Sequence, residues 1–461
     1  YCQMNMNNKK IYIDEVANIF SKKNVYSSYL FIEKELATAQ GELKMIPKSS
    51  AIEISKKCNI KYFNLELFEK DLQKSKAPIV SLVRSIVNAC NEEAKKFVHY
   101  GATTHNILHA GTTLLFRKAH VQAMFRMSEC LETLSLLSKK HSNLPMVARS
   151  NGQHAMPITF GFKLAEWTEE LLRFEQRFEE LEKRLFVLIF GGAVGAMHSF
   201  RNKGDLLYKK LAKKLNLNTV HVPSRAIYDN TAEYALLCGH LGSALLNIGR
   251  ELEFYMREEV QAISEKLAKG VVGSSTMPQK INPKYVYAFI AAANDMACYT
   301  VRGNAVMSIS NEGDHATHVF ARQTIHEMLP KLNVLLEDFN GLLNTIQVHP
   351  EKMIQTLELT QGLINAENVV MEVAPIIGKQ KAYKALHDAI DHVRYKKMSF
   401  EDALLLDKDI SSNLSAKDIR NLVDPKKNTG NSAAVAIRVS KLAQIRSAKL
   451  KKRLQKIKTV F

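Results

Sequence analysis

One short stretch, Gly273 to Pro283, concentrates residue types that suit acid–base chemistry on a small anion. Within it a serine, Ser274, is followed by a lysine and an asparagine, Lys280 and Asn282, and two prolines frame the lysine and the asparagine. Glycine permits backbone conformations that other residues resist, whereas proline fixes φ. We therefore predict a loop that becomes ordered over an anionic substrate. Lys280 would supply charge, Asn282 would supply hydrogen-bond donors, and Ser274 would take a proton.

A second polar segment, residues 99–106, places Thr103 and Thr104 directly after a glycine turn, with His99 just before it. Hydroxyl and backbone donors at the start of a helix can bind a carboxylate, and a histidine can titrate near neutral pH. The alternative is a threonine-rich helix cap beside a surface histidine.

The stretch from Gly273 to Pro283 fits the pattern Gly-Ser-Ser-x-Met-Pro-x-Lys-x-Asn-Pro. It resembles the signature of the fumarase/aspartase superfamily, in particular its branch of adenylosuccinate lyases and 3-carboxy-cis,cis-muconate cycloisomerases. Such enzymes take a proton from the carbon beside a carboxylate and expel a leaving group from the neighbouring carbon. The resemblance implies that Ser274 is the catalytic base and that Lys280 and Asn282 hold a substrate carboxylate. We expect a stepwise anti elimination that needs no metal ion and no organic cofactor.

Residues 99–106 resemble the first active-site segment of the same family, His-x-Gly-x-Thr-Ser-x-Asp. This resemblance implies that Thr103 and Thr104 bind substrate. It also makes His99 a candidate catalytic residue.

Residues 149–157 resemble the family's second active-site segment, Arg-Thr-His-x-Gln-x-Ala-x-Pro. The resemblance implies that Arg149, Ser150 and Gln153 bind substrate. Asn151 stands at the position of the family's general-acid histidine, which makes it the most consequential departure in this segment.

Asn151 and Asn106 replace a histidine and an aspartate that many family members carry. Asparagine cannot release a proton near pH 7. The leaving group therefore needs no strong acid, or another residue supplies the proton, and His99, His105 and His154 are the candidates.

Two further positions differ from the cycloisomerase-like branch. His109 stands at a second aspartate position, and Tyr228 precedes Asp229 where branch members often have an arginine. These changes leave open whether activity is reduced or redirected.

The elements that position these segments are predicted to be helices, because the dominant hydrophobic period is helical. From Leu164 the apolar residues recur at alternating steps of three and four, which is typical of a long helix that packs along one seam. Strand signals are sparse. We therefore expect an all-α protein whose long helices form a bundle. Its stripes are Leu164, Trp167, Leu171, Phe174, Phe178, Leu181 and Leu185; Val121, Met124, Met127, Leu131 and Leu134; and Leu241, Leu245, Ile248, Leu252 and Tyr255.

Three turn-rich breaks divide the chain into regions. We expect an N-terminal helical domain over residues 1–110, a central long-helix bundle over 111–355 and a small C-terminal helical domain over 356–461. The family resemblance implies the same division. It also implies that the central domains of four copies form the 20-helix core of a homotetramer, in which three subunits contribute to each active site.

The chain has 461 residues and a net charge of +18, half of which lies between residues 438 and 458. Such a run could contact nucleic acid or anionic lipid. It lacks interleaved aromatic residues and no nucleic-acid motif accompanies it, so we favour a solvated basic helix and expect no nucleic-acid partner. The remaining excess of positive charge suits a small-molecule polycarboxylate substrate.

No apolar run reaches the roughly 18 residues that a membrane-spanning helix requires, so we expect no membrane association. Residues 1–10 lack the apolar core of a signal peptide. The six cysteines are scattered without a CxxC pair, as in a protein with reduced thiols. We therefore expect a cytoplasmic protein.

Three functions remain open at this point. The first is a C–N lyase that releases fumarate from a succinyl-substituted amine by β-elimination, as adenylosuccinate lyase does. The second is a lactonising enzyme similar to 3-carboxy-cis,cis-muconate cycloisomerase. The third is a catalytically impaired homologue with a structural or binding role, suggested by Asn106 and Asn151. Fumarate as a product would separate the first two.

Overall fold

The computed structural model describes residues 16–267 and 270–457. Helices dominate this part of the chain, and its strands form two antiparallel two-stranded sheets. The expected all-α class is therefore confirmed. None of the described helices combines the length and the apolar composition needed to cross a membrane. The N-terminal stretch 1–10 and Lys458 lie outside the described residues.

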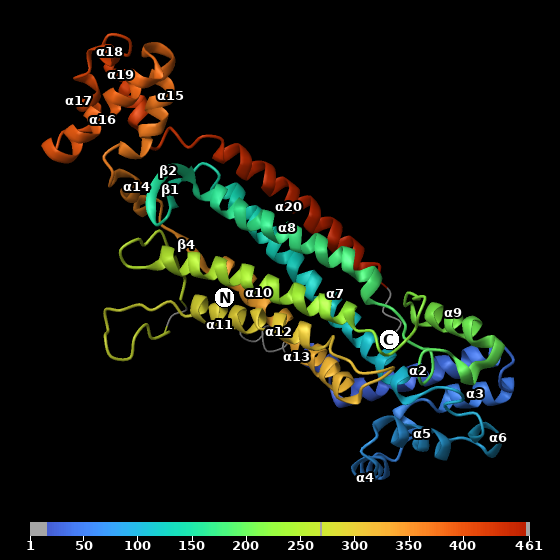
Figure 1. Cartoon of the computed structure of the whole chain (residues 1–461). Helices are drawn as coiled ribbons and strands as arrows, with labels where there is room; N and C mark the ends of the chain where they lie inside the picture. The colour runs from blue at the N-terminus through green and yellow to red at the C-terminus, as the bar shows by residue number, and fades with distance from the viewer. Residues whose placement is uncertain (1–15, 268–269, 458–461) are drawn as a thin grey trace.

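The molecule is elongated, with a bundle of long helices between two groups of shorter helices (Figure 1). The bundle contains α7 (Thr104–Lys140), α8 (Phe160–Leu185), α10 (Asp229–Met256), α11 (Tyr285–Ala297), α12 (Tyr299–Ala305), α13 (His315–Thr345) and α20 (Ser432–Gln455). At one end lie α2 (Lys22–Glu42), α3 (Lys48–Lys57), η1 (Ile60–Tyr62), α4 (Leu65–Ser75), α5 (Pro78–Ala89), α6 (Glu92–Lys95), η2 (His198–Lys203) and α9 (Gly204–Leu215).

The opposite end carries the C-terminal small domain and the two sheets (Figure 1). Its helical elements are α14 (Pro350–Glu358), η3 (Leu363–Asn365), α15 (Ala366–Ile377), α16 (Lys379–Lys396), α17 (Phe400–Leu405), α18 (Lys408–Ser411) and α19 (Ala416–Val423). The strands are β1 (Pro145–Ser150), β2 (Gln153–Thr159), β3 (Ile263–Glu265) and β4 (Ile346–Val348). The strands β1 and β2 pair with each other, as do β3 and β4.

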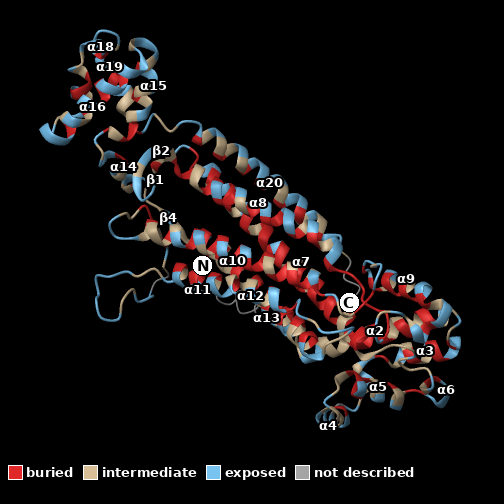
Figure 2. Ribbon diagram, viewed as in Figure 1, coloured by how far each residue is buried: buried red, intermediate tan, exposed pale blue. Residues whose placement is uncertain are grey.

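The hydrophobic stripes form the core of the bundle. All residues of the stripes that start at Leu164 and Leu241 are buried, and in the third stripe only Val121 remains partly exposed. Figure 2 shows this buried surface running along the inside of the long helices. The predicted helical seams are therefore confirmed.

The basic helix α20 packs against α7 and α8 in the bundle. Ser135 of α7 donates a hydrogen bond to the backbone oxygen of Ser440 over 2.9 Å. Arg446 and Arg453 bind the carboxylates of Glu175 and Glu182 on α8. Part of the positive charge of this helix is therefore neutralised within the chain.

The helices cross the boundaries expected between the three regions. Residues 110 and 111 lie inside α7, and residue 355 lies inside α14. The expected region 356–461 contains two different parts, because α15–α19 share a separate hydrophobic core whereas α20 joins the core of the bundle. The small domain is thus an insertion between two helices of the bundle.

The close contact between α10 and α11 gives a stability prediction. A Cβ atom at Gly242 would lie 2.6 Å from the backbone nitrogen of Ala297, whereas one at Gly341 on α13 would meet no atom within 4 Å. We expect Gly242→Ala to lower the free energy of unfolding by about 1–3 kcal/mol through overpacking. The control Gly341→Ala should raise it by about 0.5–1 kcal/mol. Thermal unfolding of both variants checks this; equal effects would contradict the packing.

Candidate active site

The loop that carries Ser274 connects β3 to α11 and extends away from the bundle (Figure 1). Glu265, the last residue of β3, fixes the far end of this loop. Its carboxylate accepts hydrogen bonds from the backbone N–H groups of Lys284, Tyr285 and Val286 over 2.6, 3.0 and 2.6 Å. A carboxylate at a helix N-terminus satisfies free donors and interacts favourably with the helix dipole. The two ends of the loop are thereby held together.

Within the loop, Ser274 is surrounded by backbone donors. Its Oγ accepts hydrogen bonds from the N–H groups of Met277 and Thr276 at 3.1 and 3.4 Å. Donors directed at an oxygen stabilise negative charge that develops on it. These two donors would therefore stabilise negative charge on the Ser274 oxygen.

The predicted carboxylate-binding residues lie on the same loop. The side-chain amide of Asn282 donates to the backbone oxygen of Gly273 over 3.1 Å, which joins the two arms of the loop beside Ser274. A Cβ at Gly273 would lie 2.6 Å from the backbone oxygen of Lys280, so this approach requires glycine. The Lys280 side chain is exposed. The loop therefore carries Ser274, Lys280 and Asn282 within nine positions of one another.

The second segment forms the hairpin of β1 and β2. Asn151 and Gly152 occupy its tip with φ values of 52° and 77°, the left-handed conformation that two-residue hairpin turns use. Asparagine adopts this conformation at little cost. Asn151 therefore provides the backbone conformation that the turn requires, and its side chain is exposed. Ser150 and Gln153 lie next to the turn, at the ends of the two strands.

Arg149 and His154 face each other across this hairpin. The Arg149 guanidinium lies over the ring of Phe254, 5.0 Å from its centroid, which ties the hairpin to the end of α10. Burial and the charge of Arg149 lower the pKa of His154. His154 is therefore less suited than an ordinary histidine to hold a proton near neutral pH.

The third segment leads into α7. Thr103 is the N-cap residue of the helix, Thr104 is its first residue, and Asn106 accepts a hydrogen bond from the Thr103 backbone N–H over 3.2 Å. Asn106 therefore completes the helix cap, a role for which an amide serves as well as a carboxylate.

His99 is held by a buried carboxylate. Its Nδ1 lies 2.5 Å from Oε1 of Glu33 on α2, a side chain with only 1% of its surface exposed. Burial of the imidazole lowers the pKa of His99, but the charge and hydrogen bond of Glu33 outweigh this effect and raise it above its usual value. Of the three histidines considered as replacement acids, His99 is the one whose pKa is raised.

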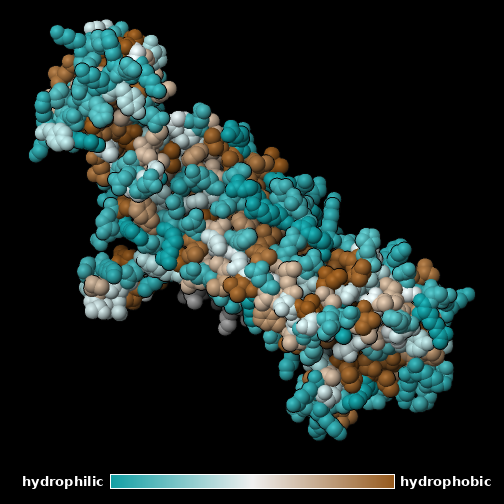
Figure 3. Space-filling model, in the orientation of Figure 1, coloured by the Kyte–Doolittle hydropathy of each residue, from teal (hydrophilic) through white to brown (hydrophobic). Residues whose placement is uncertain are grey.

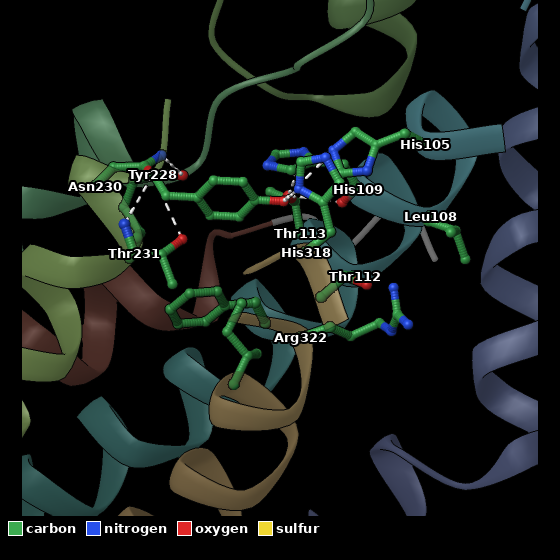
Figure 4. Close-up of a pocket in the computed structure, with 13 residues that line it drawn as sticks. His105, Leu108, His109, Thr112, Thr113, Tyr228, Asn230, Thr231, His318 and Arg322 are labelled. Carbon is green, nitrogen blue, oxygen red and sulfur yellow. Dashed lines mark hydrogen bonds between the residues drawn. The ribbon is translucent and has the colours of Figure 1, made fainter. Parts of the chain in front are cut away.

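His105 points into a cavity that α7 forms with α13 and the start of α10 (Figure 4). Its ring centroid lies 4.1 Å from that of His318 and 5.8 Å from that of His109. Burial, followed by neighbouring positive groups, lowers the pKa of His105 far below its ordinary range. His105 is therefore neutral and cannot be the acid that replaces a histidine at position 151.

The three segments do not meet within one chain. Tyr228, at the start of α10, contacts the His105 cavity, whereas Phe254, near the end of α10, contacts Arg149. At 1.5 Å per residue these two points of α10 are about 40 Å apart. No small substrate spans that distance, so a single copy cannot use both segments at one site.

Sequence patterns missed several residues of this arrangement: Glu33, Glu265, His318 and Arg322. They lie far along the chain from the residues that they contact, and no local motif marks them. A signal was present only for Glu265, an acidic residue that precedes the glycine-rich stretch.

Comparison with known proteins identifies the family. A family model described as "Lyase" matches residues 9–303, and a second, described as "Adenylosuccinate lyase C-terminus", matches residues 362–439. The chain belongs to this lyase family, within the fumarase/aspartase superfamily, and is an enzyme of the lyase class.

Individual relatives cover nearly the whole chain. It is 31% identical over 416 residues to trans-aconitate decarboxylase 1 of Mycosarcoma maydis, covering 89% of this chain and 83% of the relative. It is also 31% identical over 423 residues to N-acetyl-S-(2-succino)cysteine lyase of Enterococcus italicus, covering 90% and 91%. A solved 3-carboxy-cis,cis-muconate lactonizing enzyme from Pseudomonas putida aligns with a TM-score of 0.85 at 27% identity, over 94% of this chain and 97% of that chain.

The pair of Glu33 and His99 gives a titration prediction. Glu33→Gln keeps a hydrogen-bonding group but removes the charge that raises the pKa of His99. The pKa should therefore fall below its wild-type value, and the imidazolium should be lost at a lower pH. NMR titration of histidine-labelled protein measures this.

A matched control is Glu182→Gln, which alters a second glutamate–histidine contact, that with His120 in the bundle. It should leave the titration of His99 unchanged. An unaltered His99 pKa in Glu33→Gln would contradict the assignment.

Proposed function

We propose that this enzyme cleaves the C–N bond of a succinyl-substituted amine by β-elimination and releases fumarate. The observation that carries this proposal is the loop of Ser274, Lys280 and Asn282, whose ends Glu265 holds together. Similarity to an N-acetyl-S-(2-succino)cysteine lyase supports a substrate with a succinyl group.

The proposed chemistry needs no residue beyond those already described. Ser274 takes the proton from the carbon beside a carboxylate, and the electron pair moves into that carboxylate. Lys280 and Asn282 stabilise the added charge. When the electron pair returns, the C–N bond breaks, the amine leaves and fumarate forms. His99, whose pKa is raised by Glu33, supplies the positive charge or the proton that the leaving group requires.

We propose further that the site is assembled from several copies of the chain in a homotetramer. The separation of about 40 Å along α10 supports this, because the segments can meet only between copies. Exposed apolar side chains on the bundle also support it, and Figure 3 shows apolar patches along the molecule. They include Phe125, Leu136, Tyr287 and Val301.

A second candidate is a lactonising reaction like that of the 3-carboxy-cis,cis-muconate cycloisomerases. Similarity to the Pseudomonas putida enzyme favours it, as does Asn151 at the hairpin tip. Opening a lactone expels a carboxylate, which, unlike an amine, leaves without a proton at neutral pH.

A substrate panel separates the two reactions. Purified protein is incubated with succinyl-amines, carboxymuconolactone and muconate derivatives while ultraviolet absorbance is followed and products are identified by mass. Fumarate from a succinyl-amine supports the first proposal and names the amine. Interconversion of muconate and lactone selects the second, and no reaction with any compound of the panel contradicts both.

The assignment of the base predicts that Ser274→Ala lowers kcat by at least about 100-fold, because the proton is no longer removed. Thermal stability should not change, since the side chain is partly exposed. Ser275→Ala, which alters the neighbouring exposed hydroxyl, serves as the control and should retain activity. An active Ser274→Ala enzyme rules out the base assignment.

Subunit mixing tests the shared site. Ser274→Ala and Thr104→Ala proteins should each be inactive alone. After unfolding and refolding together they should regain activity, because some sites then combine the intact loop of one copy with the intact Thr104 of another. Absence of recovery, with mixed oligomers demonstrated by mass, would show that each site belongs to one chain.

A further inference from the structure

The cavity beside His105 is lined by groups that suit a negative charge. The imidazoles of His105, His109 and His318 gather near the Tyr228 hydroxyl on one side of it, and Arg322 also lines it (Figure 4). None of the residues that line it, all within the described part of the chain, is acidic. Its volume of about 30 Å³ is enough for two water molecules or for a group of similar size, such as a carboxylate.

Hydrogen bonds within the cavity are incomplete. The Tyr228 hydroxyl lies 3.1 Å from Nδ1 of His318 and 3.5 Å from Nε2 of His105. Only 5% of His318 is exposed. Its other ring nitrogen, Nε2, is buried and has no hydrogen-bond partner among the described residues. A buried polar atom without a partner costs free energy, so His318 has a site for a ligand atom.

Positive charge in the cavity is not neutralised. Arg322 also lines the cavity, and the hydrogen bonds and ion pairs found among the described residues include none of its guanidinium. The nearby carboxylate of Asp314 is engaged at the start of α13, where it accepts hydrogen bonds from the Ala316 N–H and the Thr317 hydroxyl. The described residues offer no group of three or more His, Cys, Asp or Glu suited to a metal ion.

The pKa values of the histidines agree with this picture. Burial and then the guanidinium of Arg225 lower the pKa of His318 to about 4, and burial lowers that of His109 to about 4. The imidazoles are therefore neutral at pH 7, when each can donate one hydrogen bond without adding a repulsive charge. The guanidinium groups of Arg322, which lines the cavity, and of nearby Arg225 then supply the positive charge, which favours an anionic group.

The cavity also adjoins the proposed substrate site, because His105 directly follows Thr104 in α7. We propose that it binds a carboxylate on the leaving group, so that the substrate is a succinyl-amine whose amine portion carries its own carboxylate. This inference rests on the proposed function. Arg322 neutralises the carboxylate, and Nε2 of His318 and the Tyr228 hydroxyl bind its oxygens.

Matched ligands test the inference separately from the reaction. N-(Carboxymethyl)aspartate carries the third carboxylate, N-propylaspartate replaces it with an apolar group of similar size, and N-(phosphonomethyl)aspartate carries a phosphonate. Their dissociation constants are measured by calorimetry on the full-length Ser274→Ala protein, which prevents turnover. We expect the carboxymethyl ligand to bind at least about 10-fold more tightly than the propyl ligand, the effect of one charge-assisted hydrogen bond.

Substitutions of cavity residues test whether the difference in affinity between the carboxymethyl and propyl ligands depends on the cavity. Arg322→Gln and His318→Asn should remove most of the preference for the carboxymethyl ligand and change binding of the propyl ligand little. Arg322→Lys should restore part of it, which also keeps the test decisive if the glutamine variant does not fold. The control is His315→Asn, an exposed histidine on the same helix, and should have no effect.

Several outcomes overturn the inference. These are equal affinities for the carboxymethyl and propyl ligands, no binding of either, equal weakening of both by Arg322→Gln, or tighter binding of the phosphonate, which would assign the cavity to a phosphate group. Fumarate release by the wild-type enzyme is measured in parallel. Selective binding without fumarate from any ligand would support the carboxylate site and contradict the proposed elimination.

Discussion

The rigidity of the long helices is the constraint on which the rest of this structure depends. Helix α10 connects the His105 cavity at its first turn to the Arg149 hairpin at its last, and its hydrogen-bonded backbone cannot shorten. The core stripes hold α7, α8 and α10 together along their whole length. Chemistry that uses both ends therefore depends on contacts between copies, and the bundle has to supply the surface for those contacts as well as its own core.

Carboxylates outside the recognisable segments organise the site. Glu265 binds three backbone N–H groups and so fixes one end of the loop that carries Ser274. Glu33 binds His99 and raises the pKa of its imidazole. Both are nearly inaccessible to solvent, so their charges are weakly screened and act strongly on the groups that they contact. The cavity of Arg322 differs, because none of the described residues that line it is acidic. The structure therefore has one region that holds cations and another that suits an anion.

Sequence patterns predicted the features that depend on neighbouring residues, namely the helices, their buried faces and the loop. Steps of three and four residues identified the buried faces of α8 and α10, and the residue types from Gly273 to Pro283 identified a loop. Contacts between distant segments could not be predicted in this way. No periodicity in the sequence pairs Glu33 with His99 or brings His318 next to His105. The same limit explains why helix α20 could be recognised as basic but not as a member of the bundle.

Helix α20 packs against two helices that are synthesised long before it, α7 and α8. The groove between α7 and α8 stays uncovered until α20 has left the ribosome, although both helices are made much earlier. The small domain of α15–α19 has its own core and can fold during this interval. Serines on the face of α7 that contacts α20 reduce the apolar surface that is exposed before α20 packs. A nascent chain that stops before Ser432 would therefore present an open groove to chaperones.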